Sequence, residues 1–168
     1  MLRLTLIRLV PRPLHVIALR SVHAMRLRWW HLRGTWVSGC RVVVLDAEDR
    51  VLLIRHSYGA PHWMLPGGGM KRGEDPIAAA LREAHEEADV RMNHALRIGM
   101  VTEMAHGGDN EVHVIAGWTT DSARPDGREI TEAQFFALDA LPPDLSAKLR
   151  PLLTGYVTAA KAARLPRD

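Results

Sequence analysis

The sequence has little cysteine and no long hydrophobic run. Cys40 is the only cysteine among 168 residues, so the chain can form neither an internal disulfide nor a zinc site built from several cysteines. No run of about 18 apolar residues occurs, so no spanning helix is expected. Arginines interrupt the apolar N-terminal stretch, which is unlike a secretory signal. We therefore expect a soluble or peripherally attached protein of a reducing compartment, with the cytoplasm as the default.

Acidic residues are absent before Asp46, whereas the first 45 residues carry eight arginines. The arginines are spread among apolar residues that recur at roughly helical spacing from Pro13 to Arg33, which predicts an amphipathic helix. We interpret residues 1–34 as a basic, helical extension that packs against the domain or against the partner in a homodimer. Contact with a membrane surface or with RNA, or a disordered leader, are the alternatives.

Residues 35–168 are expected to form one domain, because this length suits a single hydrophobic core. Short β-branched runs predict a hairpin and further strands. The candidate strands are Arg41 to Leu45, Val51 to Arg55, His62 to Leu65, Ile98 to Glu103, Glu111 to Trp118 and Gln134 to Leu138. A helical stretch begins at Leu145, and Pro151 must break, kink or restart it.

A helix is predicted from Asp75-Pro76 to about Ala88. Asp75 is a suitable N-cap, and Pro76 suits the first helical position, where a missing N–H costs nothing. Apolar residues recur on one side of this helix and predict its core face. They are Ile77, Ala80, Leu81, Ala84 and Ala88.

Three carboxylates share another face of this helix. Glu83, Glu86 and Glu87 stand at i, i+3 and i+4, where like charges repel. A bound Mg²⁺ or Mn²⁺ would offset that repulsion, since both prefer hard oxygen ligands. Taken alone, the carboxylates favour the other interpretation, a solvated helix face on which Arg82 and Glu86 form an ion pair.

The surrounding sequence distinguishes these interpretations. The segment Gly68 to Val90 resembles the Nudix box, G-x5-E-x7-R-E-U-x-E-E-x-G-U, where U is a bulky aliphatic residue. Its glycine, its first glutamate and its R-E and E-E pairs are matched by Gly68, Glu74, Arg82-Glu83 and Glu86-Glu87. The pattern departs at Asp89, where the family has glycine, and at Ala84, which is smaller than usual. Because Asp enters the left-handed region more readily than most residues, helix termination at Asp89 should survive.

This resemblance to Nudix hydrolases implies an α/β fold, an α/β/α sandwich around a mixed sheet. It implies that Glu83, Glu86 and Glu87 hold Mg²⁺, or Mn²⁺ as a substitute, with the Gly67 carbonyl as a further ligand. Arg82 would orient a glutamate. Glu74 would act through the loop and helix scaffold or from outside the metal's direct ligands.

The resemblance also implies a catalytic base, which would be either a box glutamate, Glu83 or Glu86, or a carboxylate from a later loop. Glu129 is the best candidate of the second kind, ahead of Glu103 and Glu111. Arg55, Lys71 and Arg72 flank the glycine-rich turn and are candidates to bind substrate phosphates. Trp63 and Trp118 could stack on a nucleobase, although tryptophans between apolar neighbours more often pack in the core.

The implied function is Mg²⁺-dependent hydrolysis of an acid anhydride, the diphosphate linkage of a nucleotide sugar, ADP-ribose or a nucleoside triphosphate. One alternative is an enzyme that removes pyrophosphate or a cap from the RNA 5′ end. Another is a catalytically weak binding or regulatory module. The box does not determine the substrate, so loops near His106 and Asp126, or residues 1–34, are expected to do so.

Overall fold

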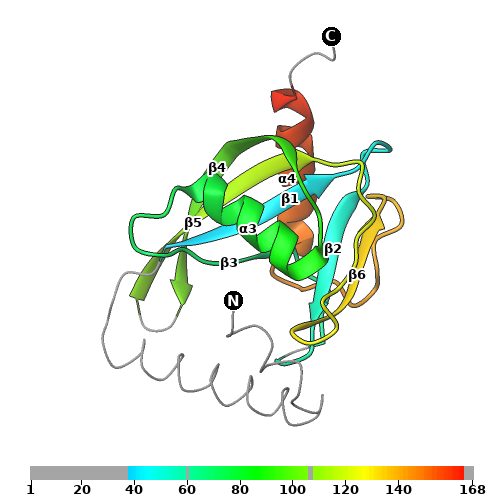
Figure 1. The fold of residues 1–168 in the computed structure, drawn as a ribbon, viewed down its shortest axis with the longest axis horizontal. Helices are drawn as coiled ribbons and strands as arrows, with labels where there is room; N and C mark the ends of the chain where they lie inside the picture. Colours follow the sequence, from blue (N-terminus) through cyan, green and yellow to red (C-terminus); the bar gives the residue numbers. More distant parts are fainter. Residues whose placement is uncertain (1–37, 60, 106–107, 165–168) are drawn as a thin grey trace, which may run out of the picture.

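The structure is a computed structural model that describes residues 38–59, 61–105 and 108–164. The amphipathic helix expected at residues 13–33 and the loop residue His106 lie outside these ranges. The described part contains six strands and two helices (Figure 1). Neither helix is long and apolar enough to cross a membrane.

The strands form one mixed sheet in the order β4-β5-β1-β2-β6. The central β1 (Gly39–Leu45) runs parallel to β5 (Gly108–Trp118) and antiparallel to β2 (Val51–His56). The outer strands β4 (Asn93–Ala105) and β6 (Ile130–Phe136) pair antiparallel with β5 and β2. The mixed sheet agrees with the expected fold.

Several strand predictions need correction. The hairpin of β1 and β2 is confirmed, but no strand forms at 62–65, where two residues make only isolated bridges. The short strand in this region is β3 (Gly67–Gly69), which pairs with the first part of β1. The last strand starts at Ile130, not Gln134, because its first residues already pair with β2.

Each face of the sheet is covered by a helix, α3 (Pro76–Ala88) on one side and α4 (Arg150–Ala163) on the other. Alternate residues of β1 serve the two faces: Val42 and Val44 belong to the core beside α3, and Val43 and Leu45 to the core beside α4. A strand buried on both faces reads as a continuous apolar run, which is what β1 shows. The predicted α/β/α sandwich is confirmed.

Helix α3 begins and ends as its sequence predicts. The Asp75 carboxylate accepts a hydrogen bond from the Ala78 N–H at 2.9 Å, and Pro76 lies in the first turn. Asp89 ends the helix in the left-handed region, with φ 54° and ψ 34°. The family glycine is therefore replaced here without loss of the helix terminus.

The predicted core face of α3 is partly wrong. Ala80, Ala84 and Ala88 are fully buried, but Leu81 is 39% exposed and Ala79 takes the neighbouring buried position. The buried stripe follows the i, i+4, i+8 row of alanines, and Leu81 lies on its solvent side. Because the buried residues are small, the carboxylate-bearing side of the helix can lie close to β3.

The C-terminal helix also starts later than expected. Leu145 precedes α4 and bridges to Trp63, and the helix begins at Arg150 with Pro151 in its first turn. Proline in the first turn lacks only an N–H that would have no helical partner. Pro151 therefore starts this helix rather than kinking it.

Candidate active site

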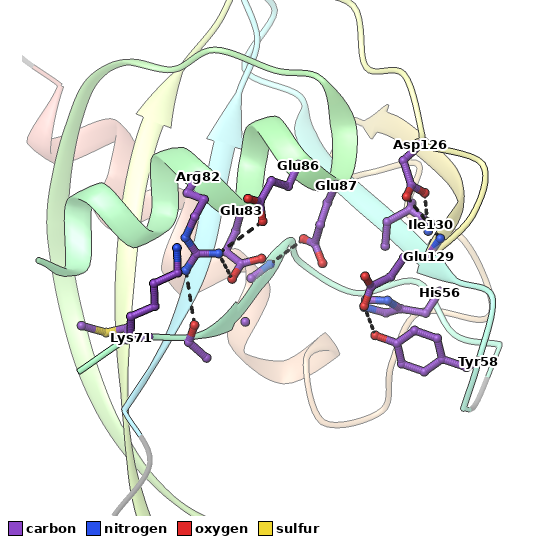
Figure 2. A pocket seen from close by; sticks show the side chains of 14 residues that line it. His56, Tyr58, Lys71, Arg82, Glu83, Glu86, Glu87, Asp126, Glu129 and Ile130 are labelled. Atoms are coloured by element: carbon purple, nitrogen blue, oxygen red, sulfur yellow. Dashed lines mark hydrogen bonds and ion pairs between the residues drawn. The ribbon is translucent and has the colours of Figure 1, made fainter. Parts of the chain in front are cut away.

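A pocket of about 420 Å³ lies beside β3 and the end of α3 (Figure 2). One wall is helix α3, the floor is the glycine strand, and the other wall comes from the segments after β2 and before β6. Its charged lining residues are the acidic Glu83, Glu86, Glu87, Asp126 and Glu129 and the basic Lys71 and Arg82. Its size is within the range of small-molecule sites.

Two glycines of β3 lie in close contact with β1 and with a carboxylate of the helix. Gly67 has φ 148°, and a Cβ on it would lie 2.2 Å from the Cys40 carbonyl oxygen. A Cβ on Gly68 would lie 2.6 Å from Glu83 Oε1. Gly67 is therefore needed for the close packing of β3 against β1, and Gly68 leaves room for the Glu83 carboxylate beside the strand.

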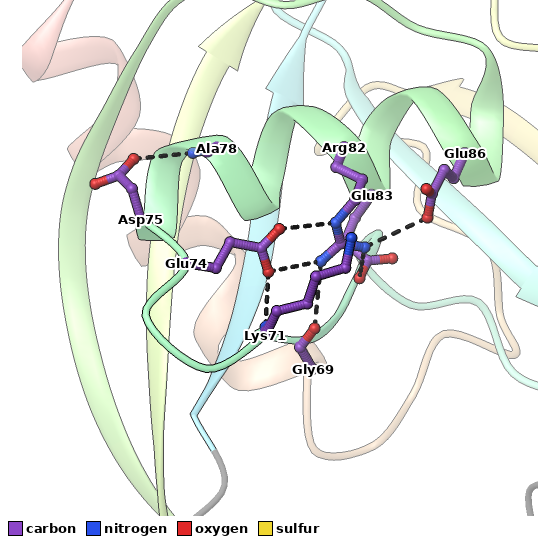
Figure 3. Close-up of polar contacts among 8 residues, drawn as sticks. All are labelled: Gly69, Lys71, Glu74, Asp75, Ala78, Arg82, Glu83 and Glu86. Atoms are coloured by element: carbon purple, nitrogen blue, oxygen red, sulfur yellow. Dashed lines mark hydrogen bonds and ion pairs between the residues drawn. The ribbon is translucent and has the colours of Figure 1, made fainter.

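Arg82 joins the loop to the helix (Figure 3). Its Nε and Nη2 donate to the two Glu74 oxygens at 2.9 and 3.0 Å, and its Nη1 donates to Glu83 Oε1 at 2.7 Å. Weaker contacts at 3.3 Å reach Glu86 Oε2 and the Gly69 carbonyl. Arg82 therefore fixes one oxygen of Glu83 and both oxygens of Glu74.

Glu74 belongs to the scaffold of the site. Besides Arg82, it accepts a hydrogen bond from the Lys71 N–H at 2.7 Å, which closes the loop before α3. The Arg82 hydrogen bonds are the main cause that lowers the pKa of Glu74 to about 2, and those same contacts hold the pKa of Arg82 above its usual value. Glu74 stays ionised and bound to Arg82.

Burial acts in the opposite direction on the helix carboxylates. Glu87 is only 6% exposed, and burial is the main cause that raises its pKa to about 9, despite the hydrogen bond that its Oε2 accepts from Gly67 N–H at 2.9 Å. Burial also raises the pKa of Glu83, and this effect is larger than the lowering caused by the Arg82 hydrogen bond. Glu129 adds negative charge near both residues. Burial in this pocket therefore disfavours the ionised form of Glu83 and Glu87, even though Arg82 binds Glu83.

The wall opposite the helix comes from two segments far apart in sequence. Glu129 lies before β6, and its carboxylate accepts a hydrogen bond from the Tyr58 hydroxyl, after β2. The Tyr58 ring lies 5.1 Å from the ring of His56, measured between centroids. Figure 2 shows these three side chains across the pocket from the helix glutamates.

The donor chemistry of the pocket fits a hard divalent cation. Carboxylates from α3 face the carboxylates of Glu129 and Asp126, and oxygen ligands of this kind suit Mg²⁺ or Mn²⁺. In the described ranges no three His, Cys, Asp or Glu side chains are already grouped to hold one ion. Glu83 and Glu87 instead face Arg82 and the Gly67 N–H. The raised pKa values of these glutamates mark them as the groups that a cation would stabilise.

Some predicted site residues lie away from this pocket. Arg55 pairs with Glu132 at 3.0 Å and Asp144 at 2.6 Å, so the phosphate role predicted for it has no support in the geometry. Arg72, which is exposed, and Glu111, which is half-buried, both lie outside the lining, and Glu103 pairs with Arg41 at 2.6 Å. Trp63 and Trp118 are 4% and 6% exposed and belong to the core.

Three polar side chains of the lining, those of His56, Tyr58 and Asp126, were not identified as site residues from the sequence. The Asp126 loop was expected to affect substrate choice, and the turn pair Asp126-Gly127 marked it as a loop, but no role followed for the side chain. His56 and Tyr58 carried no signal, because only the pairing of β2 with β6 brings them to Glu129. The site therefore depends on contacts about 70 residues apart along the chain.

Comparison with known proteins gives a consistent result. The family model described as the NUDIX domain matches residues 36–156. The chain is 43% identical over 54 residues to diphosphoinositol polyphosphate phosphohydrolase 3-alpha of Mus musculus, which is 32% of this chain and 33% of that protein. The aligned part thus spans about a third of the length of the curated relatives that it matches.

Solved structures share the fold at low sequence identity. A MutT NUDIX hydrolase from Burkholderia pseudomallei is 24% identical, with a TM-score of 0.61 over 77% of this chain and 99% of that chain. An Ap4A hydrolase from C. elegans is 22% identical, with a TM-score of 0.58 over 76% of this chain and 99% of that chain. At these identities the likeness establishes the fold alone, and the chemistry must be argued from the residues of the pocket.

Proposed function

The chain belongs to the Nudix family, whose domain model matches residues 36–156, and from this premise we propose that it hydrolyses the diphosphate linkage of a nucleoside diphosphate derivative with the help of Mg²⁺. The observation that carries the proposal is the pocket in which five carboxylates meet beside a strand of glycines. Such a concentration of acid is unfavourable for a protein alone. It is suited to binding divalent cations together with substrate phosphates.

Glu83, Glu86 and Glu87 would hold the cation. When bound, it would neutralise charge on the diphosphate and lower the pKa of a coordinated water. The chain's own contribution is to fix these oxygens in advance, because Arg82 holds Glu83 at 2.7 Å and the Gly67 N–H holds Glu87 at 2.9 Å. Pre-positioned ligands reduce the reorganisation needed during the reaction.

We assign the role of general base to Glu129. Tyr58 donates to its Oε1, which leaves Oε2 to accept a proton from the attacking water. The water oxygen forms a bond to one phosphorus while the bond from that phosphorus to the bridging oxygen breaks. The bridging oxygen leaves with the second phosphate, and the proton on Glu129 later passes to solvent.

The charges of the pocket favour a substrate with few phosphates. Among the residues that the structure describes, the pocket lining contains two Lys or Arg residues, Lys71 and Arg82, and Arg82 is already bound to three glutamates. The Mus musculus relative is named for diphosphoinositol polyphosphates, substrates that carry many phosphates beyond the one removed. A nucleoside diphosphate derivative needs fewer cationic partners and matches this lining better.

A Mg²⁺-dependent product-release screen would test the proposal. We expect turnover of at least one of ADP-ribose, nucleotide sugars, dinucleoside polyphosphates or nucleoside triphosphates. We expect its kcat/KM to exceed that for a diphosphoinositol polyphosphate by at least about 10-fold, the effect of one missing charge-assisted contact. Absence of turnover on every diphosphate would refute the hydrolase assignment, and a preference for the inositol substrate would refute the substrate class.

Lys71 and Arg72 offer a matched pair of neighbouring cations. Lys71 lines the pocket, whereas Arg72 is exposed outside it. We expect Lys71→Ala to raise KM about 10-fold, because it removes a cation from the phosphate site, and Arg72→Ala to leave KM unchanged. Steady-state kinetics on the best substrate of the screen measure both. Equal effects of the two substitutions would show that Lys71 acts only through general surface charge.

A further inference from the structure

The part of the β5–β6 loop that carries Glu129 is organised by the side chain of Asp126. The Asp126 carboxylate accepts hydrogen bonds from the backbone N–H groups of Arg128 at 2.9 Å and Ile130 at 2.8 Å. The Gly127 N–H donates to the Ile130 carbonyl at 3.0 Å, and Gly127 has φ 68°, which glycine adopts without strain. The backbone on either side of Glu129 is therefore fixed within the loop.

The loop is also attached to the segment that follows β2. The Ser57 N–H donates to the Glu129 carbonyl at 2.8 Å, and the Thr131 hydroxyl donates to the Arg55 carbonyl at 3.1 Å. The pairing of β2 with β6 shifts register between Arg55 and His56, next to these contacts. Such irregularities commonly redirect side chains at sites. The hydrogen bonds of Ser57 and Thr131 fix the backbone around Glu129 but do not fix the direction of its carboxylate.

Like charges oppose the observed position of the Glu129 carboxylate. Glu83, Glu86 and Asp126 line the same pocket, and in water a glutamate side chain would turn away from acidic neighbours. A hydrogen bond from the Tyr58 hydroxyl to Oε1 offsets this repulsion at the carboxylate. The Tyr58 ring in turn lies against His56, at 5.1 Å between centroids.

We propose that Tyr58 is a positioning residue that holds the Glu129 carboxylate in the pocket, with one oxygen bound to the phenol and the other directed toward the reaction. This role rests on the proposed hydrolase function, since Glu129 is the base in that reaction. Tyr58 acts through Glu129 and not on the substrate. Its loss should therefore reduce kcat much more than it changes KM.

Tyr58→Phe tests the proposal because it removes the hydroxyl and keeps the ring beside His56. Tyr156→Phe is the matched control. Tyr156 is the only other tyrosine, it packs against the α4 side of the core, and its hydroxyl has no hydrogen-bond partner among the described residues. We expect Tyr58→Phe to lower kcat about 10-fold or more, with KM within about 2-fold. Tyr156→Phe should match the wild type.

A double variant separates positioning from a general structural effect. If Tyr58 acts through Glu129, then Tyr58→Phe combined with Glu129→Gln should be no slower than Glu129→Gln alone. Losses that multiply in the double variant, or a Tyr58→Phe enzyme as fast as wild type, would overturn the proposal. Thermal unfolding of each variant verifies that it is folded. If Tyr58→Phe does not fold, Glu129→Gln, compared with wild type, still measures what the loss of the Glu129 carboxylate costs.

Crystal structures give a readout that does not require activity. In Tyr58→Phe the Glu129 carboxylate should leave the pocket, whereas in Tyr156→Phe it should stay. A Glu129 carboxylate in the same place in Tyr58→Phe and wild type would overturn the proposal whether or not the protein hydrolyses a diphosphate. A wild type inactive on all substrates, with Glu129 displaced in Tyr58→Phe, would instead refute only the proposed reaction.

Discussion

Replacing Glu87 by glutamine is expected to lower kcat/KM for Mg²⁺-dependent hydrolysis by at least about 100-fold, a loss at or above that for residues which only support a metal ligand. Glu87 is the most deeply buried of the pocket carboxylates that contact β3, at 6% exposure. Glutamine keeps the shape but cannot bring negative charge to a cation. Steady-state kinetics with a titration of Mg²⁺ measure the loss.

The same substitution should leave the fold intact. The glutamine carbonyl oxygen can still accept the Gly67 N–H that Glu87 Oε2 now accepts at 2.9 Å. A neutral amide is also less costly to bury than a carboxylate. The free energy of unfolding of Glu87→Gln should therefore equal or exceed that of wild type, which distinguishes a lost ligand from a damaged structure.

Glu111→Gln is the matched control, because it makes the same chemical change outside the pocket. It should retain wild-type kinetics and the wild-type Mg²⁺ dependence. Full activity in Glu87→Gln would contradict the assignment of Glu87 to cation binding. An equal loss in Glu111→Gln would show that the assay responds to net charge and not to the pocket.

Local signals predicted the parts of the site that are contiguous in sequence. Asp75 and Pro76 determined where α3 begins. Asp89 could end the helix because aspartate can adopt the positive φ of the left-handed region that this position requires. The spacing of Glu83, Glu86 and Glu87 placed them on one helix face. These inferences succeeded because helix geometry relates residues within a few positions of one another.

Local sequence signals could not predict the contacts between segments that are distant in sequence. The strand Gly67–Gly69 has no β-forming side chains, and it is a strand because β1 supplies its hydrogen bonds. Arg55 looked like a phosphate ligand from its place near the glycines, but β6 and the segment before α4 supply the carboxylates that bind it. Tyr58 meets Glu129 for a similar reason, through the pairing of β2 with β6. Tertiary pairing decided all three.

The stability of the metal-free protein should fall as pH rises. Burial raises the pKa of Glu87 from 4.5 to about 9, so between these values the folded state holds a proton that the unfolded state has released. The stability linked to this proton is fully present below about pH 4.5 and is lost as pH rises through about 9. Glu83, whose pKa is also raised, acts in the same direction.

Glu74 acts in the opposite sense at lower pH. Its pKa is lowered to about 2 by Arg82, so its contribution is present above about pH 4.5 and is lost as pH falls toward 2. The metal-free protein should therefore be most stable in mildly acidic solution. Its melting temperature in EDTA should be about 5 °C or more lower at pH 9 than at pH 6, the shift expected for a change of order 1 kcal/mol or more.

Mg²⁺ should reverse this dependence, because it binds the ionised carboxylates of the folded state and is linked to loss of their protons. Millimolar Mg²⁺ should raise the melting temperature much more at pH 9 than at pH 6. Glu87→Gln should flatten the metal-free pH dependence and weaken the response to Mg²⁺, whereas Glu111→Gln should retain both. A melting temperature in EDTA that is level from pH 6 to pH 9 would show that Glu87 ionises normally. In that case its burial would offer no reason for a cation to bind beside it.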